Sequence, residues 1–375
     1  MIETERFVPK ETEKPTASTA VYTPPNIISN DAMVDHLTKV LNVRKSSGEP
    51  YTADDIERVT GISERHYCTE IGASPLNRAG IVPAMGTRVA LEAFNGRKDW
   101  DYVDDVFAST GVPYKKSLGK EIAENLRASG VEVVQSRQDV YAECTSPVWI
   151  LNFIRENEDE FDGKNILMVA SEYGSPVVDG KDKTLPSDAA TAIAFTYGKD
   201  LRVLGSSILH QPDLKDLIRV SILPEYTPPE GSLFFCEVGQ PSEEKKLYGE
   251  EKYGLNLRYM EMDGRGVFNW LANPNTIPPI IDEACEIAGV TRDEIDVVIP
   301  HQANGRVIDI MGGLIGIDQK KIVSNIRNHG NCGSATTMLA WHEAVEEGLI
   351  KKGSKVLVLG FGAGMMAGAA LVEVN

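Results

Sequence analysis

The chain has 375 residues, of which 42% are hydrophobic and 25% charged, as in an ordinary globular protein of one large or two medium domains. No stretch approaches 18 uncharged apolar residues, so we expect no membrane span. The formal net charge of −17 repels nucleic acid and anionic lipid, and we expect neither as a partner.

Five widely spaced cysteines without a CxxC pair predict neither a disulfide framework nor a zinc site, so we expect no bound metal. They are Cys68, Cys144, Cys236, Cys285 and Cys332. The first 19 residues are rich in Glu, Lys, Thr and Pro and lack the apolar core of a secretory signal, which predicts a poorly ordered arm. A reducing cytoplasm is then the simplest compartment.

Apolar β-type runs and amphipathic helices alternate along the chain, which predicts an α/β fold with mostly parallel strands. In chain order the predicted elements are helix 31–41, strand 103–109, helix 119–129, helix 147–157, strand 165–171, strand 190–195, helix 279–288, strand 297–300, helix 335–347, strand 355–360 and strand 368–374.

An internal repeat divides the chain. The order helix, strand, loop, strand follows Cys144 and occurs again after Asn331, which predicts two similar half-domains with the site at their junction. General self-similarity of α/β sequences is the alternative explanation. The proline-rich and charged stretch 209–256 interrupts the pattern and indicates a surface excursion or the seam between the halves. We therefore expect an arm at 1–18, a half that contains Cys144 at 19–205, and a half that contains His301 and Asn331 at 206–375.

Cys144 precedes an apolar run that predicts a buried helix beginning near Pro147, where the missing N–H costs nothing. A sulfur at a helix N-terminus lies at the positive end of the helix dipole, so we expect a lowered thiol pKa and a nucleophilic thiolate. The alternative is a small buried hydrophobic residue, as most free cysteines are. Cys285, on an apolar helical face, and Cys236, in a predicted strand, are expected to be core residues.

His301 follows the apolar run 297–300, at the carboxyl end of a predicted strand, where α/β folds place their sites. An uncharged imidazole there can donate an N–H to a developing oxyanion, and the alternative is a histidine hydrogen-bonded within its loop. Asn331 lies in a glycine-containing turn that allows a ligand to approach closely, or it caps the helix that follows. His329 and Cys332 are competing candidates in the same turn.

Cysteine, histidine and asparagine are together what thioester chemistry requires: a nucleophile that carries an acyl group, and two polar groups that stabilise an enolate or oxyanion. The segment 360–364, Gly-Phe-Gly-Ala-Gly, follows a strand but does not fit a dinucleotide site, because only eleven residues remain and 368–374 reads as a strand. We expect a glycine hairpin whose backbone N–H groups help to form an oxyanion hole.

From about Ser18 to Val374 these motifs together resemble the β-ketoacyl-[acyl-carrier-protein] synthase III group of the thiolase superfamily. The motifs are 300–304 with Arg306, 329–331, 360–364 with the terminal strand and, more weakly, 60–65, 187–190 and 262–264 with Val267 and Phe268. The resemblance implies a thiolase-like five-layered αβαβα sandwich of two pseudo-repeated half-domains, and a homodimer.

The resemblance also implies a role for each site residue. Cys144 takes the place of the acylated nucleophile, and His301 and Asn331 take the places of the pair that stabilises the enolate. Two backbone N–H groups would hold the tetrahedral oxyanion. One is the N–H of Cys144, and the other comes from the Gly362–Gly364 loop, from either Gly362 or Gly364.

Asn304 and Arg306 match positions near the mouth of a pantetheine tunnel. Arg306 would anchor a carrier phosphate or an acidic carrier helix, as a local basic site in an acidic protein. The substrates would be an acyl-thioester and a malonyl-thioester, carried on coenzyme A or on the phosphopantetheine of an acyl carrier protein, with no metal or redox cofactor.

The implied activity is a decarboxylative Claisen condensation that gives a β-ketoacyl-thioester in fatty acid or polyketide biosynthesis. It would proceed through an acyl-enzyme intermediate in a cytoplasmic homodimer. The alternatives are a thiolase-fold acyltransferase, a non-decarboxylating condensing enzyme similar to hydroxymethylglutaryl-CoA synthases, and a non-catalytic partner subunit. The presence of all three triad residues argues against the last.

The sequence departs from the family pattern in several places. Glu143 stands before the nucleophile, where a small residue is usual, and Ser146-Pro147 replaces Gly-Phe or similar. By ungapped count, Asp55 and Val59 occupy the positions of the Trp and Arg that hold adenine in members that use coenzyme A, which favours a donor on a carrier protein. The basic run 112–117 indicates a surface lysine pair or a polar acyl chain.

Overall fold

The structure is a computed structural model that describes residues 14–71, 78–111, 116–178, 180–220, 234–235 and 260–375. Residues 1–13 of the expected arm, Cys236, residues 112–115 of the basic run and most of the stretch 209–256 lie outside the described residues. Lys116, from the same basic run, is exposed and pairs with Glu121. In the described part of the chain, no helix is both long and apolar enough to cross a membrane.

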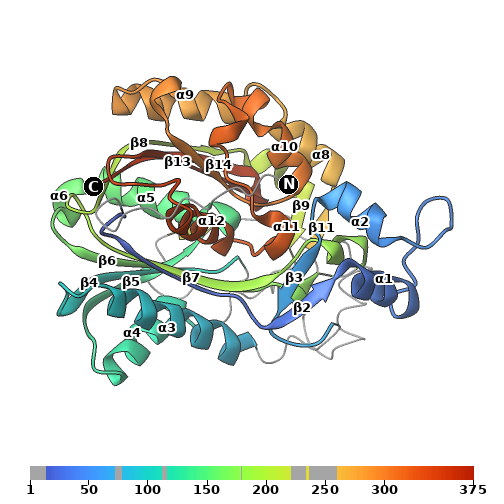
Figure 1. The fold of residues 1–375 in the computed structure, drawn as a ribbon, viewed down its shortest axis with the longest axis horizontal. Helices are drawn as coiled ribbons and strands as arrows, with labels where there is room; N and C mark the ends of the chain where they lie inside the picture. The colour runs from blue at the N-terminus through green and yellow to red at the C-terminus, as the bar shows by residue number, and fades with distance from the viewer. Residues whose placement is uncertain (1–13, 72–77, 112–115, 179, 221–233, 236–259) are drawn as a thin grey trace, which may run out of the picture.

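Five layers stack in the order helices, sheet, helices, sheet, helices (Figure 1). The outer helices on one side are α9 (Ile277–Ala288) and α10 (Gly305–Ile315), and those on the other are α3 (Arg78–Gly96) and α4 (Leu118–Ala128). The central layer holds α5 (Ser146–Glu156) and α12 (Ala335–Glu346). The predicted α/β class and five-layered sandwich are thus confirmed.

The first sheet has the strand order β1-β7-β6-β4-β5-β10 and the second β12-β13-β14-β8. Their strands are β1 (Ser18–Tyr22), β4 (Tyr102–Ser109), β5 (Glu132–Tyr141), β6 (Asn165–Tyr173), β7 (Asp188–Thr196), β8 (Leu201–His210), β10 (Phe234–Phe235), β12 (Val297–Pro300), β13 (Lys355–Gly362) and β14 (Met366–Val374). The described residues also form short two-stranded sheets of β2 (Asn26–Ser29) with β3 (Glu64–Tyr67) and of β9 (Ile218–Val220) with β11 (Met260–Met262).

Both large sheets are mixed, so the prediction of mostly parallel strands is wrong. β4 pairs in parallel with β5 and β6, and β12 with β13, but β6–β7, β13–β14, β14–β8 and β1–β7 are antiparallel. Parallel neighbours need a crossover of a dozen or more residues that is usually helical, whereas β13 continues into β14 through the three-residue turn at Ala363–Met365. The glycine-containing segment 360–364 therefore makes a hairpin, as predicted.

The predicted repeat corresponds to α5–β6–β7 and α12–β13–β14, which follow the same order of helix, strand and antiparallel strand. α5 and α12 lie side by side between the sheets (Figure 1), and both are largely buried. Small and apolar residues surround each helix almost completely, as expected for a helix covered on both faces. β8 spans the expected boundary near residue 205 and lies in the second sheet.

One buried carboxylate joins the two halves. Glu172, near the end of β6, is 3% exposed and accepts hydrogen bonds from the backbone N–H groups of Gly111 at 2.7 Å and Ser334 at 2.9 Å. Ser334, the residue before α12, also donates its hydroxyl to Glu172 at 2.5 Å. The start of α12 is thus fixed to the first sheet by charge-assisted hydrogen bonds.

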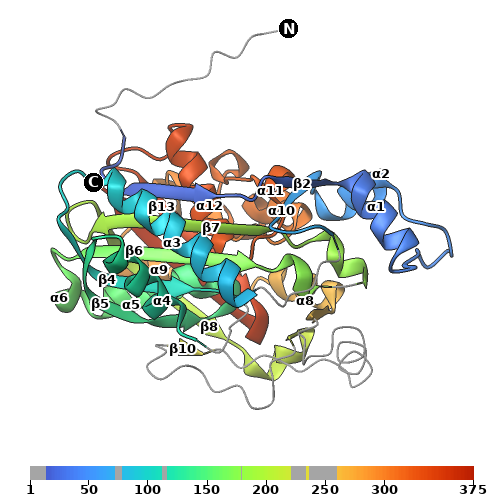
Figure 2. The same ribbon diagram turned by 90° about the horizontal axis from the view of Figure 1, so that it is seen from below.

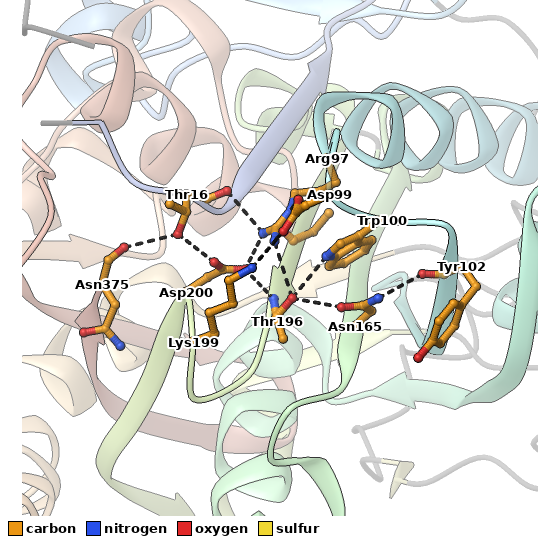
Figure 3. A network of polar contacts seen from close by, with 11 residues as sticks. Thr16, Arg97, Asp99, Trp100, Tyr102, Asn165, Thr196, Lys199, Asp200 and Asn375 are labelled. Atoms are coloured by element: carbon orange, nitrogen blue, oxygen red, sulfur yellow. Dashed lines mark hydrogen bonds and ion pairs between the residues drawn. The ribbon is translucent and has the colours of Figure 1, made fainter. Parts of the chain in front are cut away.

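A buried ion pair lies where β7 turns into β8. Arg97, after α3, pairs with Asp200, and Asp200 also accepts a hydrogen bond from Thr16 Oγ1 at 2.6 Å (Figure 3). Trp100 Nε1 donates to Thr196 Oγ1 at 3.1 Å in the same network. These contacts fasten the strand β1 and the end of α3 to the first sheet.

The helices α1 (Asn30–Lys39) and α2 (Ala53–Thr60) extend from one end of the molecule in both views (Figures 1 and 2). They pack around their own small hydrophobic cluster, formed by Ile28, Met33, Leu37, Ile56 and Tyr67. A capping box begins α2 at Thr52. The remaining described α-helices are α6 (Glu158–Phe161), α8 (Gly264–Leu271) and α11 (Ile326–His329).

Candidate active site

A pocket of about 470 Å³ lies among residues from both halves. Cys144, His301 and Asn331, which are remote in sequence, all line it. Asn304, Arg306 and Gly362 line it as well, whereas Gly364 is buried in the adjacent turn and does not. The structure thus brings the three predicted side chains to one cavity, which is the spatial requirement of the predicted chemistry.

Cys144 lies in a single 3-10 turn, Glu143–Thr145, directly before α5. The hydroxyl of Ser146 fixes this turn, because it accepts from Ala142 N at 3.0 Å and donates to Glu143 O at 2.8 Å. Pro147 occupies the first turn of α5, as the sequence predicts. Glu143 has φ of 49°, a left-handed conformation that costs a non-glycine residue about 1–2 kcal/mol. Such strain is found at functional sites.

The expectation of a lowered thiol pKa is wrong. Burial, followed by the negative charges of Glu143 and Glu172, raises the pKa of the Cys144 thiol well above its ordinary value. The helix dipole acts from α5, but Cys144 lies two residues before the helix begins and the two carboxylates oppose it. The Cys144 side chain is therefore a neutral thiol at pH 7.

Glu143→Gln should lower the pKa of Cys144, because it removes the negative charge of the adjacent residue and leaves a side chain of the same shape. More thiolate is then present at a given pH, so iodoacetamide should alkylate Cys144 several-fold faster at pH 7–8. The rate is measured by mass spectrometry, with Cys144→Ala giving the background from other cysteines. Glu156→Gln, at the far end of α5, is the matched control and should match wild type. An unchanged rate in Glu143→Gln would show that this charge does not control the thiol.

The hairpin between β13 and β14 brings backbone close to the sulfur. A Cβ atom on Gly362 would lie 3.1 Å from Cys144 Cβ and 3.6 Å from Cys144 Sγ. The distance of 3.1 Å is shorter than nearly all contacts that Cβ atoms make in proteins. Glycine therefore allows this close approach, whereas a Cβ would press against Cys144. The backbone N–H of Cys144 also faces its own sulfur. Main-chain groups thus surround the place where a thioester carbonyl would bind.

His301 follows β12 directly, and its N–H donates to Leu359 O in the neighbouring strand β13 at 2.7 Å. Its ring meets Phe361 edge to face, with 5.3 Å between ring centroids. Nδ1 lies 2.6 Å from Thr336 Oγ1 on α12. Burial lowers the pKa of His301 to about 3, so the ring is neutral at pH 7. The strand end thus places an uncharged imidazole on the pocket.

Asn331 is fixed by its backbone and by its side-chain oxygen. Its N–H donates to Leu185 O, its carbonyl accepts from Ser187 N, and both distances are 2.9 Å. Oδ1 accepts from Gly333 N at 3.0 Å, which identifies the other terminal atom, Nδ2, as the donor. Ser334, not Asn331, stands at the start of α12. Nδ2 donates one N–H to Ala303 O at 3.4 Å, so its second N–H is the one available to the pocket.

The competing residues of this turn do not line the pocket. His329 Nε2 lies 2.6 Å from Glu343 Oε1, and its ring stacks on His66. Cys332 is buried, and its thiol lies 3.4 Å from His329 O. Cys285 is buried on α9, as predicted. These residues support the turn and the core.

The mouth of the pocket is formed by the contact between α2 and α10. A Cβ on Gly61 would lie 2.8 Å from Gly305 Cα, so neither position accepts a larger residue without movement. Asn304 Nδ2 donates to Val59 O at 3.3 Å, and Arg306 Nε donates to Arg58 O at 2.6 Å. The two predicted substrate-binding residues thus also hold the C-terminal end of α2.

Asp55 and Val59, the positions singled out for adenine binding, both line the pocket. Asp55 pairs with Lys45 and Arg58, so the rim presents an ion-paired carboxylate and an aliphatic side chain where an aromatic and a basic residue would hold adenine. Deeper, the lining is mostly apolar. It includes Ile218, Met262, Val267, Phe268, Trp270, Leu271, Phe361 and Met365.

Several contributors were not identified from the sequence. Thr336 and Phe361 contact His301, and Ser146 fixes the nucleophile turn. A hydroxyl within a helix or an aromatic residue between glycines carries no specific sequence signal. In the part of the chain that the structure describes, no group of three or more His, Cys, Asp or Glu side chains is arranged to hold a metal ion.

Comparison with known proteins reveals similarity over nearly the whole chain. Residues 285–374 match the family described as 3-oxoacyl-[acyl-carrier-protein (ACP)] synthase III C terminal. The β-ketoacyl-[acyl-carrier-protein] synthase III of Aquifex aeolicus (strain VF5) is 27% identical over 362 residues, which cover 95% of this chain and 97% of that protein.

Two solved structures show the same fold. The crystal structure of 3-oxoacyl-[acyl-carrier-protein] synthase III from Aquifex aeolicus VF5 has a TM-score of 0.71 and 26% identity, with 96% of this chain and 99% of that chain covered. The priming β-ketosynthase from the R1128 polyketide biosynthetic pathway has a TM-score of 0.72 and 22% identity, with 99% of both chains covered.

Proposed function

Because this chain belongs to the β-ketoacyl-[acyl-carrier-protein] synthase III group of the thiolase superfamily, we propose that it is a condensing acyltransferase. It forms a β-ketoacyl-thioester by decarboxylative Claisen condensation of a malonyl-thioester with an acyl group on Cys144. The observation that carries this assignment is the convergence of a thiol, a neutral imidazole and an amide N–H donor on one largely apolar pocket.

In the first half-reaction the sulfur of Cys144 attacks the carbonyl of an acyl-thioester. The bond from that carbonyl to the carrier sulfur breaks, and the carrier leaves as a thiol. The N–H of Cys144 and backbone N–H groups near Gly362 stabilise the tetrahedral oxyanion. The product of this step is an acyl-enzyme intermediate.

In the second half-reaction a malonyl-thioester binds and loses CO₂. The enolate oxygen accepts hydrogen bonds from Asn331 Nδ2 and from His301, and the enolate carbon attacks the acyl carbonyl. The carbon–sulfur bond to Cys144 then breaks, the β-ketoacyl-thioester leaves, and the thiolate takes up a proton. No metal or redox cofactor enters this scheme.

The apolar lining supports a hydrocarbon acyl chain, since polar substituents would lose their hydration there. Asp55 and Val59 offer no aromatic ring on which adenine could stack, which supports delivery by an acyl carrier protein, with Arg306 as the basic contact at the mouth. We place the enzyme as a homodimer in the cytoplasm, in fatty acid or polyketide biosynthesis, by analogy with its relatives.

The test follows both half-reactions in purified wild-type protein. A panel of acyl-thioesters is screened by intact mass for acylation of Cys144, and malonyl-carrier labelled in its free carboxyl carbon is then added. The expected result is release of labelled CO₂ in equal amount to β-ketoacyl product. Acylation followed by transfer to an alcohol or amine without CO₂ would identify an acyltransferase. Condensation of two acyl groups without a malonyl-thioester would identify a non-decarboxylating enzyme. A protein that is not acylated by any thioester of the panel would be identified as a non-catalytic subunit.

A further inference from the structure

The hydroxyl of Thr336, in the first turn of α12, contacts three polar groups. His301 Nδ1 lies 2.6 Å from Thr336 Oγ1, the backbone N–H of Gln302 donates to Oγ1 at 3.3 Å, and Oγ1 donates to Gly333 O at 3.0 Å. Thr336 is 2% exposed, so bulk water does not compete for these positions. The hydroxyl is therefore fully occupied by its protein partners.

The position of the hydrogen atoms follows from the nature of these partners. A threonine hydroxyl has one hydrogen and two lone pairs. Gly333 O can only accept, so it takes the hydroxyl hydrogen, and the Gln302 N–H can only donate, so it fills one lone pair. The remaining lone pair faces His301 Nδ1, which must supply a hydrogen at a separation of 2.6 Å. Gly333 O also accepts from Thr336 N at 3.3 Å, but the reverse assignment would bring oxygen lone pairs of Oγ1 and Gly333 O face to face at 3.0 Å with no hydrogen between them.

A neutral imidazole carries one ring hydrogen, and His301 is neutral because burial lowers its pKa to about 3. If that hydrogen is on Nδ1, then Nε2 carries a lone pair. His301 and Cys144 line the same pocket, and Nδ1 is taken by Thr336. Nε2 is thus the nitrogen left to serve the pocket, as a proton acceptor in the resting enzyme.

We propose that Thr336 is a positioning residue that holds His301 in the Nδ1–H tautomer, so that Nε2 accepts the thiol proton of Cys144 as its sulfur attacks the thioester. This catalytic role rests on the proposed function, whereas the tautomer does not. Proton transfer to Nε2 explains how a neutral thiol can act as the nucleophile. The thiol loses its proton only during the attack, so no resting thiolate is needed.

The proton is accounted for through the cycle. As the Cys144 sulfur bonds to the acyl carbon, its proton moves to His301 Nε2, and the departing carrier thiolate takes that proton from Nε2, which leaves the ring neutral. When the malonyl-thioester binds, Nε2 takes up a proton from solvent beside the malonyl carboxylate, and the Nε2–H of this imidazolium donates to the enolate oxygen formed by decarboxylation. When the bond between the acyl carbon and Cys144 breaks, Nε2 returns its proton to the sulfur.

Burial sets the conditions under which this charged ring exists. A lone imidazolium is costly in the empty pocket, so the charge requires an anion beside it. The malonyl carboxylate, and then the enolate, supply that anion in the second half-reaction. Asn331 donates to the same oxygen and remains uncharged throughout.

The tautomer can be measured directly by long-range ¹H–¹⁵N NMR on protein labelled at histidine, with the His301 signals assigned from His301→Gln. In wild-type protein near pH 7 we expect a protonated Nδ1 and an unprotonated Nε2. Thr336→Val removes the acceptor of Nδ1–H while keeping the side-chain shape, and the Nε2–H form should appear. Thr336→Ser keeps the hydroxyl and should restore the wild-type pattern.

A matched control is the next residue of the same helix. Thr337 is also buried, but its hydroxyl has no partner among the described residues and lines a separate cavity of about 20 Å³. Thr337→Val should leave the His301 signals unchanged. Two results would overturn the proposal: a wild-type spectrum with the hydrogen on Nε2 of His301, or a tautomer that is unchanged in Thr336→Val. If a variant fails to fold, the wild-type spectrum alone decides whether the proposal stands.

The kinetic consequence is tested by rapid-quench measurement of Cys144 acylation. Thr336→Val should slow acylation by about 10²-fold at saturating acyl-thioester, because proton transfer to Nε2 is lost, with little change in KM. Thr336→Ser and Thr337→Val should stay near wild type. Equal acylation rates in Thr336→Val and wild type contradict the catalytic role. A wild-type protein that is never acylated contradicts the proposed function instead, and leaves the NMR result to stand alone.

Discussion

Cys144→Ala is expected to eliminate the acyl-enzyme and to reduce β-ketoacyl formation by a factor on the order of 10⁴ or more, because Cys144 is the only cysteine among the described residues that line the pocket. Intact mass after incubation with an acyl-thioester should show no adduct. Product formation is followed by chromatography of the β-ketoacyl-thioester. Wild-type product formation in Cys144→Ala would contradict the assignment of the nucleophile.

Release of CO₂ must be measured separately in this variant. His301 and Asn331 remain in place, so the enolate of a malonyl-thioester is still stabilised and decarboxylation can continue without condensation. The matched control is Cys285→Ala, which removes a buried cysteine from α9, away from the pocket. It should retain acylation and condensation at wild-type rates. Loss of product in both variants would indicate a general effect of cysteine removal rather than loss of the nucleophile.

Arg97→Ala is expected to destabilise the fold by about 3–5 kcal/mol, because it leaves the carboxylate of Asp200 buried without its partner. The side chains of Arg97 and Asp200 are 2% and 0% exposed, and water cannot replace the guanidinium (Figure 3). The same substitution also frees Asp99 and the carbonyl of Thr16, which Arg97 holds at 2.9–3.2 Å. Urea unfolding followed by circular dichroism measures the effect as a lower midpoint.

The control for this prediction is Lys199→Ala, in the same network (Figure 3). Lys199 pairs with Asp99 at 2.9 Å, but the two side chains are 62% and 48% exposed. Exposed pairs contribute about 0–1 kcal/mol, so the midpoint should barely move. Equal destabilisation by the two substitutions would show that burial does not determine the contribution of these ion pairs.

The elements that could be predicted from the sequence are those whose signal is local. Apolar runs such as 297–300 and 355–360 become the strands β12 and β13, and the apolar run after Cys144 becomes α5. Glycine residues around 360–364 indicate the hairpin beside the sulfur. The order of motifs was sufficient to place Cys144, His301 and Asn331 in one pocket, although their roles stay predictions.

Properties that depend on packing could not be predicted in this way. The pKa of Cys144 depends on burial and on Glu172, which reaches the site from β6 and is 28 residues away in sequence. β14 runs antiparallel to β13 because a three-residue turn joins them, whereas residues 174–187 separate β7 from its antiparallel neighbour β6. Hydrophobic periodicity encodes neither strand direction. Thr336 acquires a function only because α12 passes beside the end of β12.

The helices α1 and α2 have a consequence for how substrates enter and leave. Their hydrophobic cluster is separate from the two large cores, and they meet α10 through backbone and polar contacts at Gly61, Asn304 and Arg306. A small displacement of this pair would widen the entrance without repacking either sheet, whereas Glu172 ties the two halves behind it together. Such a displacement would change the size of the entrance while the reacting groups keep their spacing.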